Sequence, residues 1–183
     1  MKVLIIIDMQ NDFINGVLGT KEAQNILPNV IKRIQESKNE LILFTFDTHD
    51  ENYLDSSEGK NLPIIHCVKD TEGWLFEPNI INAWQNIKST IRLKEIKDHY
   101  FEKPVFGSVE LVEYLVSRKD EISEVELIGV CTDICVISNA LMIKNTLPEI
   151  PVVVDGTLCA GVNPESHDKA LDVMQMCHIK VKR

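Results

Sequence analysis

The sequence lacks the excess of basic residues and the long apolar runs that are typical of nucleic-acid-binding and membrane proteins. It has no excess of basic residues, because 19 lysines and arginines stand against 28 aspartates and glutamates, a formal net charge of −9. A chain this acidic lacks the basic face that nucleic acid or an anionic membrane requires. No apolar run approaches the ~20 residues of a membrane span. We therefore expect no nucleic-acid partner and no membrane.

Two further absences concern the compartment. The apolar run at residues 3–7 is short for a signal peptide, whose apolar region has ~7–15 residues, and no small-residue cleavage site follows it. The five cysteines are an odd number without a C-x2-C pair, which is not typical of a disulfide framework. Both observations predict a protein of the reducing cytoplasm.

The sequence does contain apolar runs that alternate with helical patterns. Its 183 residues suit one domain, taken here as residues 1–183. Strands are expected at 3–7, 41–46, 100–103, 125–130, 151–154 and 178–181. Helices are expected at 26–34 (with Pro28 in its first turn), 80–87, 109–116, 137–144 and from 163 onward. This order predicts a three-layer α/β/α fold around a mostly parallel sheet of five or six strands.

The most informative segment is 129–136, at the turn between an expected strand and an expected helix. A helix N-terminus lowers the pKa of a thiol and presents free backbone N–H groups. Cys135 would then be a nucleophile with part of an oxyanion hole already formed. The alternative is that Cys131 and Cys135 are two small buried thiols, since free cysteine is often buried. This segment alone does not decide between them.

Asp8 and Lys103 are candidates to assist such a thiol. Asp8 directly follows five aliphatic residues, and a carboxylate there is costly unless it is paired, hydrogen-bonded or functional. Asp8 could remove the thiol proton, and Lys103 could stabilise the resulting charges. The alternatives are a loop-bracing aspartate and a surface lysine with a buried stem. Because ligands bind beyond the carboxyl ends of parallel strands, Asp8, Asp47 and the cysteine turn are expected to form a single site.

A second group of residues has the composition of a metal site. Asp47 and His49 follow a strand, and alternate residues of an extended chain point to the same side. Together with His66 they offer one carboxylate and two imidazoles, which suit Zn²⁺, Mn²⁺ or Fe²⁺. Glu58 could join them if its loop folds back. The alternative is a set of ordinary polar loop residues.

Together these segments resemble the isochorismatase-like cysteine hydrolase superfamily, and within it the nicotinamidase (pyrazinamidase) branch. The resemblance covers essentially the whole chain and is carried by residues 5–13, 46–49, 66–68, 103, 129–136 and 166–171. The family triad of aspartate, lysine and cysteine falls on Asp8, Lys103 and Cys135. The resemblance also implies a cis peptide bond between Val130 and Cys131. That bond would direct the N–H groups of Cys131 and Cys135 at one oxyanion.

The resemblance implies a reaction as well. Isochorismate-cleaving members generally lack the cysteine and the Asp-x-His pair, so their presence favours hydrolysis of nicotinamide to nicotinate and ammonia through a thioester, in NAD salvage. One divalent metal, with Zn²⁺ favoured, would bind the pyridine nitrogen. Many nicotinamidases have another histidine soon after Asp-x-His, and here Glu58 is the candidate in its place.

Phe13 is expected to pack against the substrate ring, with Val130 and Trp74 as further contacts. Trp74 is equally suited to a core or subunit contact. Two alternatives stay open: a related hydrolase of another small amide or carbamoyl compound, and a non-catalytic relative that binds a metal or a partner. We also expect a homo-oligomer.

Overall fold

The computed structural model describes residues 1–37, 40–88 and 99–183. Within these residues lies a six-stranded sheet in the order β3-β2-β1-β4-β5-β6, with every neighbouring pair parallel. The strands are β1 (Lys2–Ile7), β2 (Leu41–Asp47), β3 (Tyr100–Lys103), β4 (Glu124–Val130), β5 (Val152–Ala160) and β6 (Lys180–Lys182). The sheet confirms the fold class expected from the alternating apolar runs.

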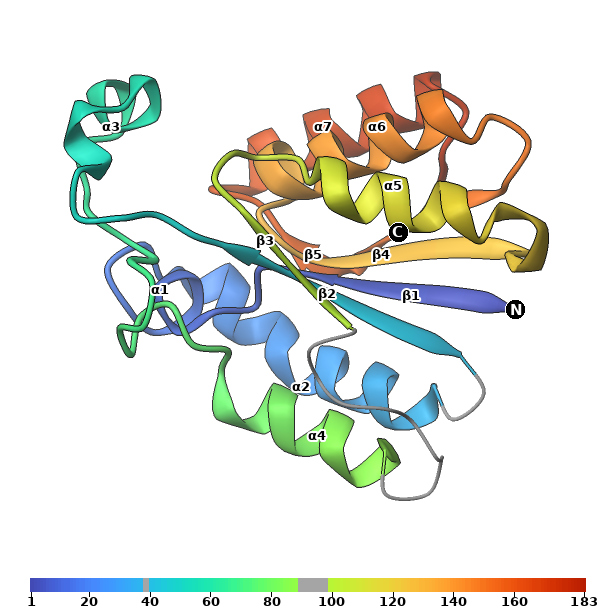
Figure 1. The fold of residues 1–183 in the computed structure, drawn as a ribbon, viewed down its shortest axis with the longest axis horizontal. Helices are drawn as coiled ribbons and strands as arrows, with labels where there is room; N and C mark the ends of the chain where they lie inside the picture. The colour runs from blue at the N-terminus through green and yellow to red at the C-terminus, as the bar shows by residue number, and fades with distance from the viewer. Residues whose placement is uncertain (38–39, 89–98) are drawn as a thin grey trace.

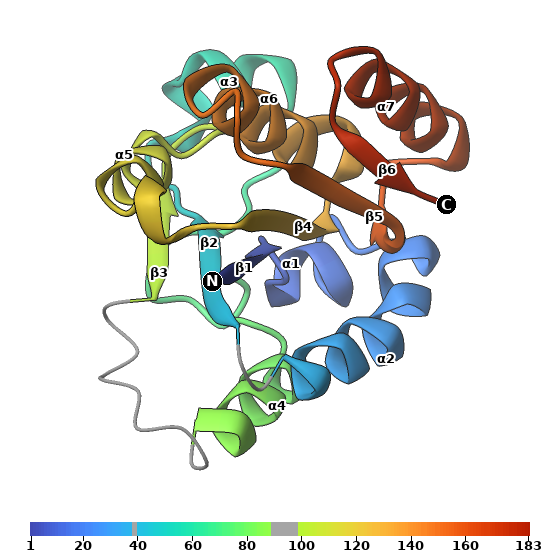
Figure 2. The same cartoon turned by 90° about the vertical axis from the view of Figure 1, so that its right-hand side faces the viewer.

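Helices cover both faces of the sheet (Figures 1 and 2). One face carries α1 (Asn11–Ile14), α2 (Lys21–Glu36) and α4 (Pro78–Lys88), and the other carries α5 (Val109–Ser117), α6 (Ile137–Thr146) and α7 (Pro164–Met176). The short helix α3 (Ser57–Asn61) stands away from these layers, beyond the carboxyl end of β2. Among the described residues, no helix has both the length and the apolar character needed to span a membrane.

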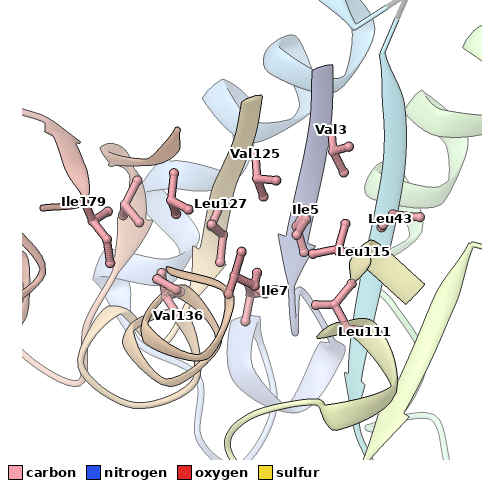
Figure 3. Close-up of a cluster of buried hydrophobic side chains, with 14 of the residues drawn as sticks. Val3, Ile5, Ile7, Leu43, Leu111, Leu115, Val125, Leu127, Val136 and Ile179 are labelled. Carbon is pink, nitrogen blue, oxygen red and sulfur yellow. The ribbon is translucent and has the colours of Figure 1, made fainter. Parts of the chain in front are cut away.

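The central strand β1 is buried on both sides. Val3, Ile5 and Ile7 pack toward α5, α6 and α7, in the cluster of Figure 3. Leu4 and Ile6 point the other way, into the cluster formed with α2 and α4. Because successive strand residues face opposite sides, a strand covered by helices on both faces needs an unbroken apolar run.

Several element boundaries differ from those expected, and three of the differences have a clear cause in the structure. Helix α2 begins at Lys21, where the Thr20 side chain accepts a hydrogen bond from the Ala23 N–H, so Pro28 lies inside the helix and its placement in the first turn was wrong. Strand β5 was expected to end at residue 154 but continues to Ala160. Polar residues after 154 interrupt the apolar run, but the strand continues through them. Strand β6 starts at Lys180, after His178, whose φ of 64° breaks the extended backbone.

The strand order places the site. The chain runs from β1 outward to β3 on one side and from β4 outward to β6 on the other, so the order reverses between β1 and β4. Ligands of open parallel sheets bind beyond the carboxyl ends of the strands at such a switch point. Register brings Ile7 opposite Gly129, and Asp47 opposite Lys103, at that end of the sheet.

Candidate active site and metal centre

The structure brings Asp8, Lys103 and Cys135 together. Asp8 follows β1, Lys103 ends β3, and Cys135 lies in a π-helical turn, Thr132–Val136, between β4 and α6. The Lys103 Nζ lies 2.7 Å from Asp8 Oδ2 and 3.5 Å from Cys135 Sγ. Asp8 and Lys103 are at most 1% exposed. An acid, an amine and a thiol that are far apart in the sequence therefore meet in a buried position.

Asp8 is held by Thr45, a residue that the sequence analysis did not single out. The Thr45 hydroxyl donates to Asp8 Oδ1 at 2.6 Å and accepts the Asp8 backbone N–H at 3.2 Å. The φ of Asp8 is 46°, in the left-handed region that residues with a Cβ rarely adopt. Register could have identified Thr45, because it pairs with Ile7, the residue before Asp8.

Burial and charge set the protonation of this group. Burial raises the pKa of Asp8, and the positive charge of Lys103 opposes that shift. Burial likewise raises the pKa of Cys135, again opposed by Lys103. Burial alone would lower the pKa of Lys103, but Asp8, Cys135 and Asp47 raise it well above its usual range. These three groups therefore favour the charged form of Lys103, whose ammonium contacts both the Asp8 carboxyl and the Cys135 thiol.

The cysteine turn begins with the expected cis peptide bond, which joins Val130 to Cys131. Cys131 is half-buried, and burial raises the pKa of its thiol to about 12. Asn139 on α6, another residue that the sequence analysis missed, donates to the Cys135 carbonyl at 2.8 Å and to the Phe106 carbonyl at 3.1 Å. This amide ties the cysteine turn to the loop that follows Lys103.

Next to this group lie Asp47, His49, Glu58 and His66, whose possible ligand atoms all fall within 4.8 Å of one another. The Nε2 atoms of His49 and His66 lie 3.0 and 3.4 Å from Asp47 Oδ2, and Glu58 Oε1 lies 3.8 Å from His49 Nε2. Helix α3 supplies Glu58. The four residues expected to bind a metal are thus brought together.

The chemistry of these four residues fits a divalent cation. Nδ1 of His66 donates to the Ile64 carbonyl at 2.7 Å, which in the neutral ring leaves the Nε2 lone pair facing Asp47. Burial raises the pKa of Glu58, and the charge of Asp47 adds to that shift. Two carboxylates and two imidazoles therefore converge, with repulsion between the carboxylates that a bound cation would relieve.

One cavity, of about 660 Å³, connects the two groups. Its lining includes Cys131 and Cys135 on one side and Asp47, Glu58 and His66 on the other. A small molecule bound there can contact the thiol and the metal-site residues at once.

Phe13, Trp74 and Val130 were also expected to contact the substrate, and the structure places them in different surroundings. Phe13 lines the cavity, with its ring centroid 5.6 Å from that of His66. Trp74 and Val130 are not among the described residues that line it. The indole N–H of Trp74 donates to Thr48 at 2.9 Å and its ring packs on Phe46, while Val130 is 1% exposed within β4.

The parallel α/β sheet therefore carries a buried acid, amine and thiol at its carboxyl end. Residues 2–181 match the isochorismatase domain family, and the chain belongs to this family. It is 30% identical over 178 residues to the isochorismatase family protein PncA of Bacillus subtilis, covering 93% of this chain and 92% of the relative.

Two solved structures share this fold. The crystal structure of nicotinamidase/pyrazinamidase PncA from Bacillus subtilis has a TM-score of 0.82 at 27% identity, covering 100% of this chain and 99% of the other. The pyrazinamidase of Pyrococcus horikoshii in complex with zinc has a TM-score of 0.78 at 26% identity, covering 100% and 98%. The family expected from the motifs is confirmed, and the chain is an amide hydrolase of the nicotinamidase type.

Proposed function

We propose that this protein hydrolyses nicotinamide to nicotinate and ammonia through a thioester on Cys135, as a step of NAD salvage. The observation that carries the proposal is the contact of Lys103 with both Asp8 and Cys135, beside a cavity that is lined by three of the four possible metal ligands. Relatives described as nicotinamidases or pyrazinamidases support the substrate.

In the first half of the reaction, Asp8 accepts the proton of the Cys135 thiol while Lys103 stabilises the negative charge between them. The thiolate attacks the carboxamide carbon, and the backbone N–H groups of Cys131 and Cys135 bind the oxyanion that forms. Oxyanion donors of this kind typically lower a barrier by ~3–4 kcal/mol each. Asp8 then gives its proton to the leaving amine, so that ammonia departs and a thioester remains.

In the second half, water attacks the thioester carbonyl and Asp8 accepts a proton from it. The tetrahedral intermediate collapses, its bond to sulfur breaks, and the product leaves as nicotinic acid, which ionises to nicotinate in solution. The Cys135 thiolate regains its proton from Asp8. Atoms and charge balance, because one water is consumed and one ammonia is released for each amide.

Asp47, His49 and His66, with Glu58 as a fourth ligand, would hold one divalent metal. When bound, that metal would supply a Lewis acid that anchors the pyridine nitrogen, so that the carboxamide is presented to Cys135. The zinc complex of the related pyrazinamidase supports Zn²⁺, with Mn²⁺ or Fe²⁺ as alternatives. Phe13 would pack against the ring, whereas Val130 and Trp74, which do not line the cavity, would act on the substrate only through their neighbours.

The test is ammonia release from nicotinamide by the purified protein, with and without a chelator. We expect turnover that falls on chelation and returns when Zn²⁺ is added. Absence of ammonia from the Zn²⁺-loaded protein at saturating nicotinamide would contradict the proposal.

A second candidate is another small amide or carbamoyl compound. The cavity volume lies within the ~300–1,000 Å³ of sites that bind drug-sized ligands, which are larger than nicotinamide. A panel of amides assayed for ammonia release separates the two candidates by kcat/KM. A non-catalytic relative would release ammonia from none of them.

The remaining parts of the proposal concern the setting of the enzyme. All five cysteines lie in the described part of the chain and none forms a disulfide, which supports a reducing compartment such as the cytoplasm. We also infer that residues 1–183 act as one catalytic domain and that the protein is a homo-oligomer. Light scattering after size-exclusion chromatography measures the oligomeric state.

A further inference from the structure

Gln10 is fully buried, two residues after Asp8, and its side chain is fixed by backbone groups. Its Oε1 accepts the Asp47 N–H at 2.8 Å, and its Nε2 donates to the Asp47 carbonyl at 2.9 Å and to the Trp74 carbonyl at 2.8 Å. Both hydrogens of the amide are therefore used, and both backbone polar groups of Asp47 are bound by one side chain.

These bonds continue the sheet where β1 has ended. The pairing of β1 with β2 stops at Ile7 and Thr45, because the backbone turns at Asp8. Asp47 lies two residues further along β2 and has lost its β1 neighbour, although it still pairs with Lys103 on β3. The amide of Gln10 has the donor and acceptor of a peptide group, so it takes the place of the missing strand.

The position of Asp47 matters because its two carboxylate oxygens have different partners. Oδ1 accepts from Lys103 Nζ at 3.1 Å, whereas Oδ2 faces the Nε2 atoms of His49 and His66. A shift of the Asp47 backbone would alter both sets of distances. A residue that fixes this backbone without touching the ligand atoms acts on the metal site through Asp47.

Asp12, on the same segment, makes a similar contact with the loop that carries the ligand candidate His66. Its Oδ2 accepts the Cys67 N–H at 2.8 Å, and its own N–H donates to the Gly73 carbonyl at 3.0 Å. Cys67 directly follows His66 and has a φ of 46°, a conformation that a non-glycine residue keeps only when its surroundings hold it.

We propose that Gln10 and Asp12 are positioning residues that hold Asp47 and His66 at the spacing needed to bind a metal. The segment that carries the general base therefore also sets metal affinity. This inference rests on the metal site of the proposed function. It assigns roles to two side chains that line neither the cavity nor the metal site itself.

The experiment measures Zn²⁺ binding by the metal-free protein in competition with a chromogenic chelator. Gln10→Met keeps the length of the side chain but loses every hydrogen bond, and Asp12→Leu loses the acceptor for Cys67. We expect each to bind Zn²⁺ ~10–100-fold more weakly, the range for residues that orient ligands. Gln24→Met is the matched control, since Gln24 is exposed and its side-chain amide donates to the Ile14 carbonyl and not to Asp47 or to the His66 loop. It should bind Zn²⁺ as the wild type does.

Two readouts separate positioning from general damage to the fold. Circular dichroism identifies the temperature range in which each metal-free variant is folded, and binding is measured there. Asp12→Asn retains an oxygen acceptor and should recover most of the affinity lost in Asp12→Leu. With the metal loaded, both weakened variants should show a raised KM with a smaller change in kcat.

The outcomes are distinct. Folded Gln10→Met and Asp12→Leu proteins with wild-type Zn²⁺ affinity would overturn the inference. If Gln10→Met does not fold, the Asp12 pair decides alone: equal affinity in Asp12→Leu and Asp12→Asn overturns it, and recovery in Asp12→Asn supports it. Failure of the wild type to bind Zn²⁺ would overturn the metal site itself, and ammonia release by the same preparation would show whether the thiol chemistry stands.

Discussion

Asp47 and Lys103 lie opposite each other at the ends of β2 and β3, with 3.1 Å between Asp47 Oδ1 and Lys103 Nζ. Because Asp47 Oδ2 faces His49 and His66, this carboxylate belongs to both groups of functional residues. The thiol group and the metal group thus form one continuous polar network.

Cys135→Ala should abolish ammonia release from nicotinamide while the circular dichroism spectrum is retained, because the nucleophile is lost and a small side chain remains. Cys177→Ala is the control, since Cys177 is exposed and lies at the end of α7. Steady-state assays of both variants check this. Measurable turnover by Cys135→Ala above the background of uncatalysed hydrolysis would refute the nucleophile assignment.

Lys103→Met should impair both activity and stability. It leaves the buried carboxylates of Asp8 and Asp47 without their shared cation, and breaking a buried ion pair typically costs ~3–5 kcal/mol. Urea unfolding at neutral pH measures the loss. Lys69→Met removes an exposed pair with Glu102 and should change the unfolding midpoint very little. Equal stability of the two variants would show that Lys103 does not compensate these charges.

Thr45→Val should move the acid limb of the pH profile of kcat/KM to higher pH. The Thr45 hydroxyl stabilises the charged form of Asp8, so its loss raises the pKa of Asp8 beyond the shift caused by burial. Activity, which needs ionised Asp8, is then lost at a higher pH as the pH falls. A hydrogen bond to a charged group contributes ~1.5–3 kcal/mol, which corresponds to a shift of about one pH unit or more.

The control for this shift is Thr146→Val, on the exposed end of α6, where the hydroxyl only donates to the Met142 carbonyl. Its acid limb should match that of the wild type. If the acid limb of the kcat/KM profile is unchanged in Thr45→Val, a group other than Asp8 sets the pH at which activity is lost.

Removal of the metal by a chelator should chiefly raise KM, because Asp47, His49 and His66 would hold a metal that positions the ring instead of activating the thiol. Steady-state kinetics before and after dialysis measure the split between KM and kcat. The alkylation rate of Cys135 by iodoacetamide should fall much less than kcat/KM. A KM unaffected by chelation would count against ring anchoring.

Glu126 provides a stability test away from the site. It is buried on β4 and forms ion pairs with Arg33 and Lys182. Burial alone would raise its pKa, but these partners lower it below the ordinary value of 4.5. Its stabilisation is therefore present above that value and is lost as the pH falls through the lowered pKa. Glu126→Gln should cost ~1.5–3 kcal/mol of unfolding free energy at neutral pH.

This cost should begin to shrink as the pH falls below 4.5 and should vanish below the lowered pKa of Glu126, where the wild-type carboxylate is itself protonated. Thermal or urea unfolding at several pH values measures it. Glu124→Gln, which removes a pair with the exposed Lys2, is the control and should change stability little at any pH. A pH-independent cost of Glu126→Gln would mean that packing, not charge, is lost.

The strands and their burial were readable from the sequence. A parallel strand covered on both faces must be apolar at every position, so the runs at 3–7, 41–46 and 125–130 identified β1, β2 and β4 to within a residue. The boundaries of α2 and β5 were less readable. A proline can lie within a helix, and polar residues can lie within a strand, when packing elsewhere supports them.

The sequence by itself determined the residue types of the site. A carboxylate after a buried strand and a thiol at a strand-to-helix turn can each be recognised from the neighbouring residues in the sequence. The tertiary structure alone decided which groups touch: that Lys103 reaches both Asp8 and Cys135, that Glu58 approaches His49, and that Trp74 turns to Thr48. Gln10, Thr45 and Asn139 could not be recognised from local pattern. Their partners are distant in sequence, and only the register of the strands and the packing of the loops sets those distances.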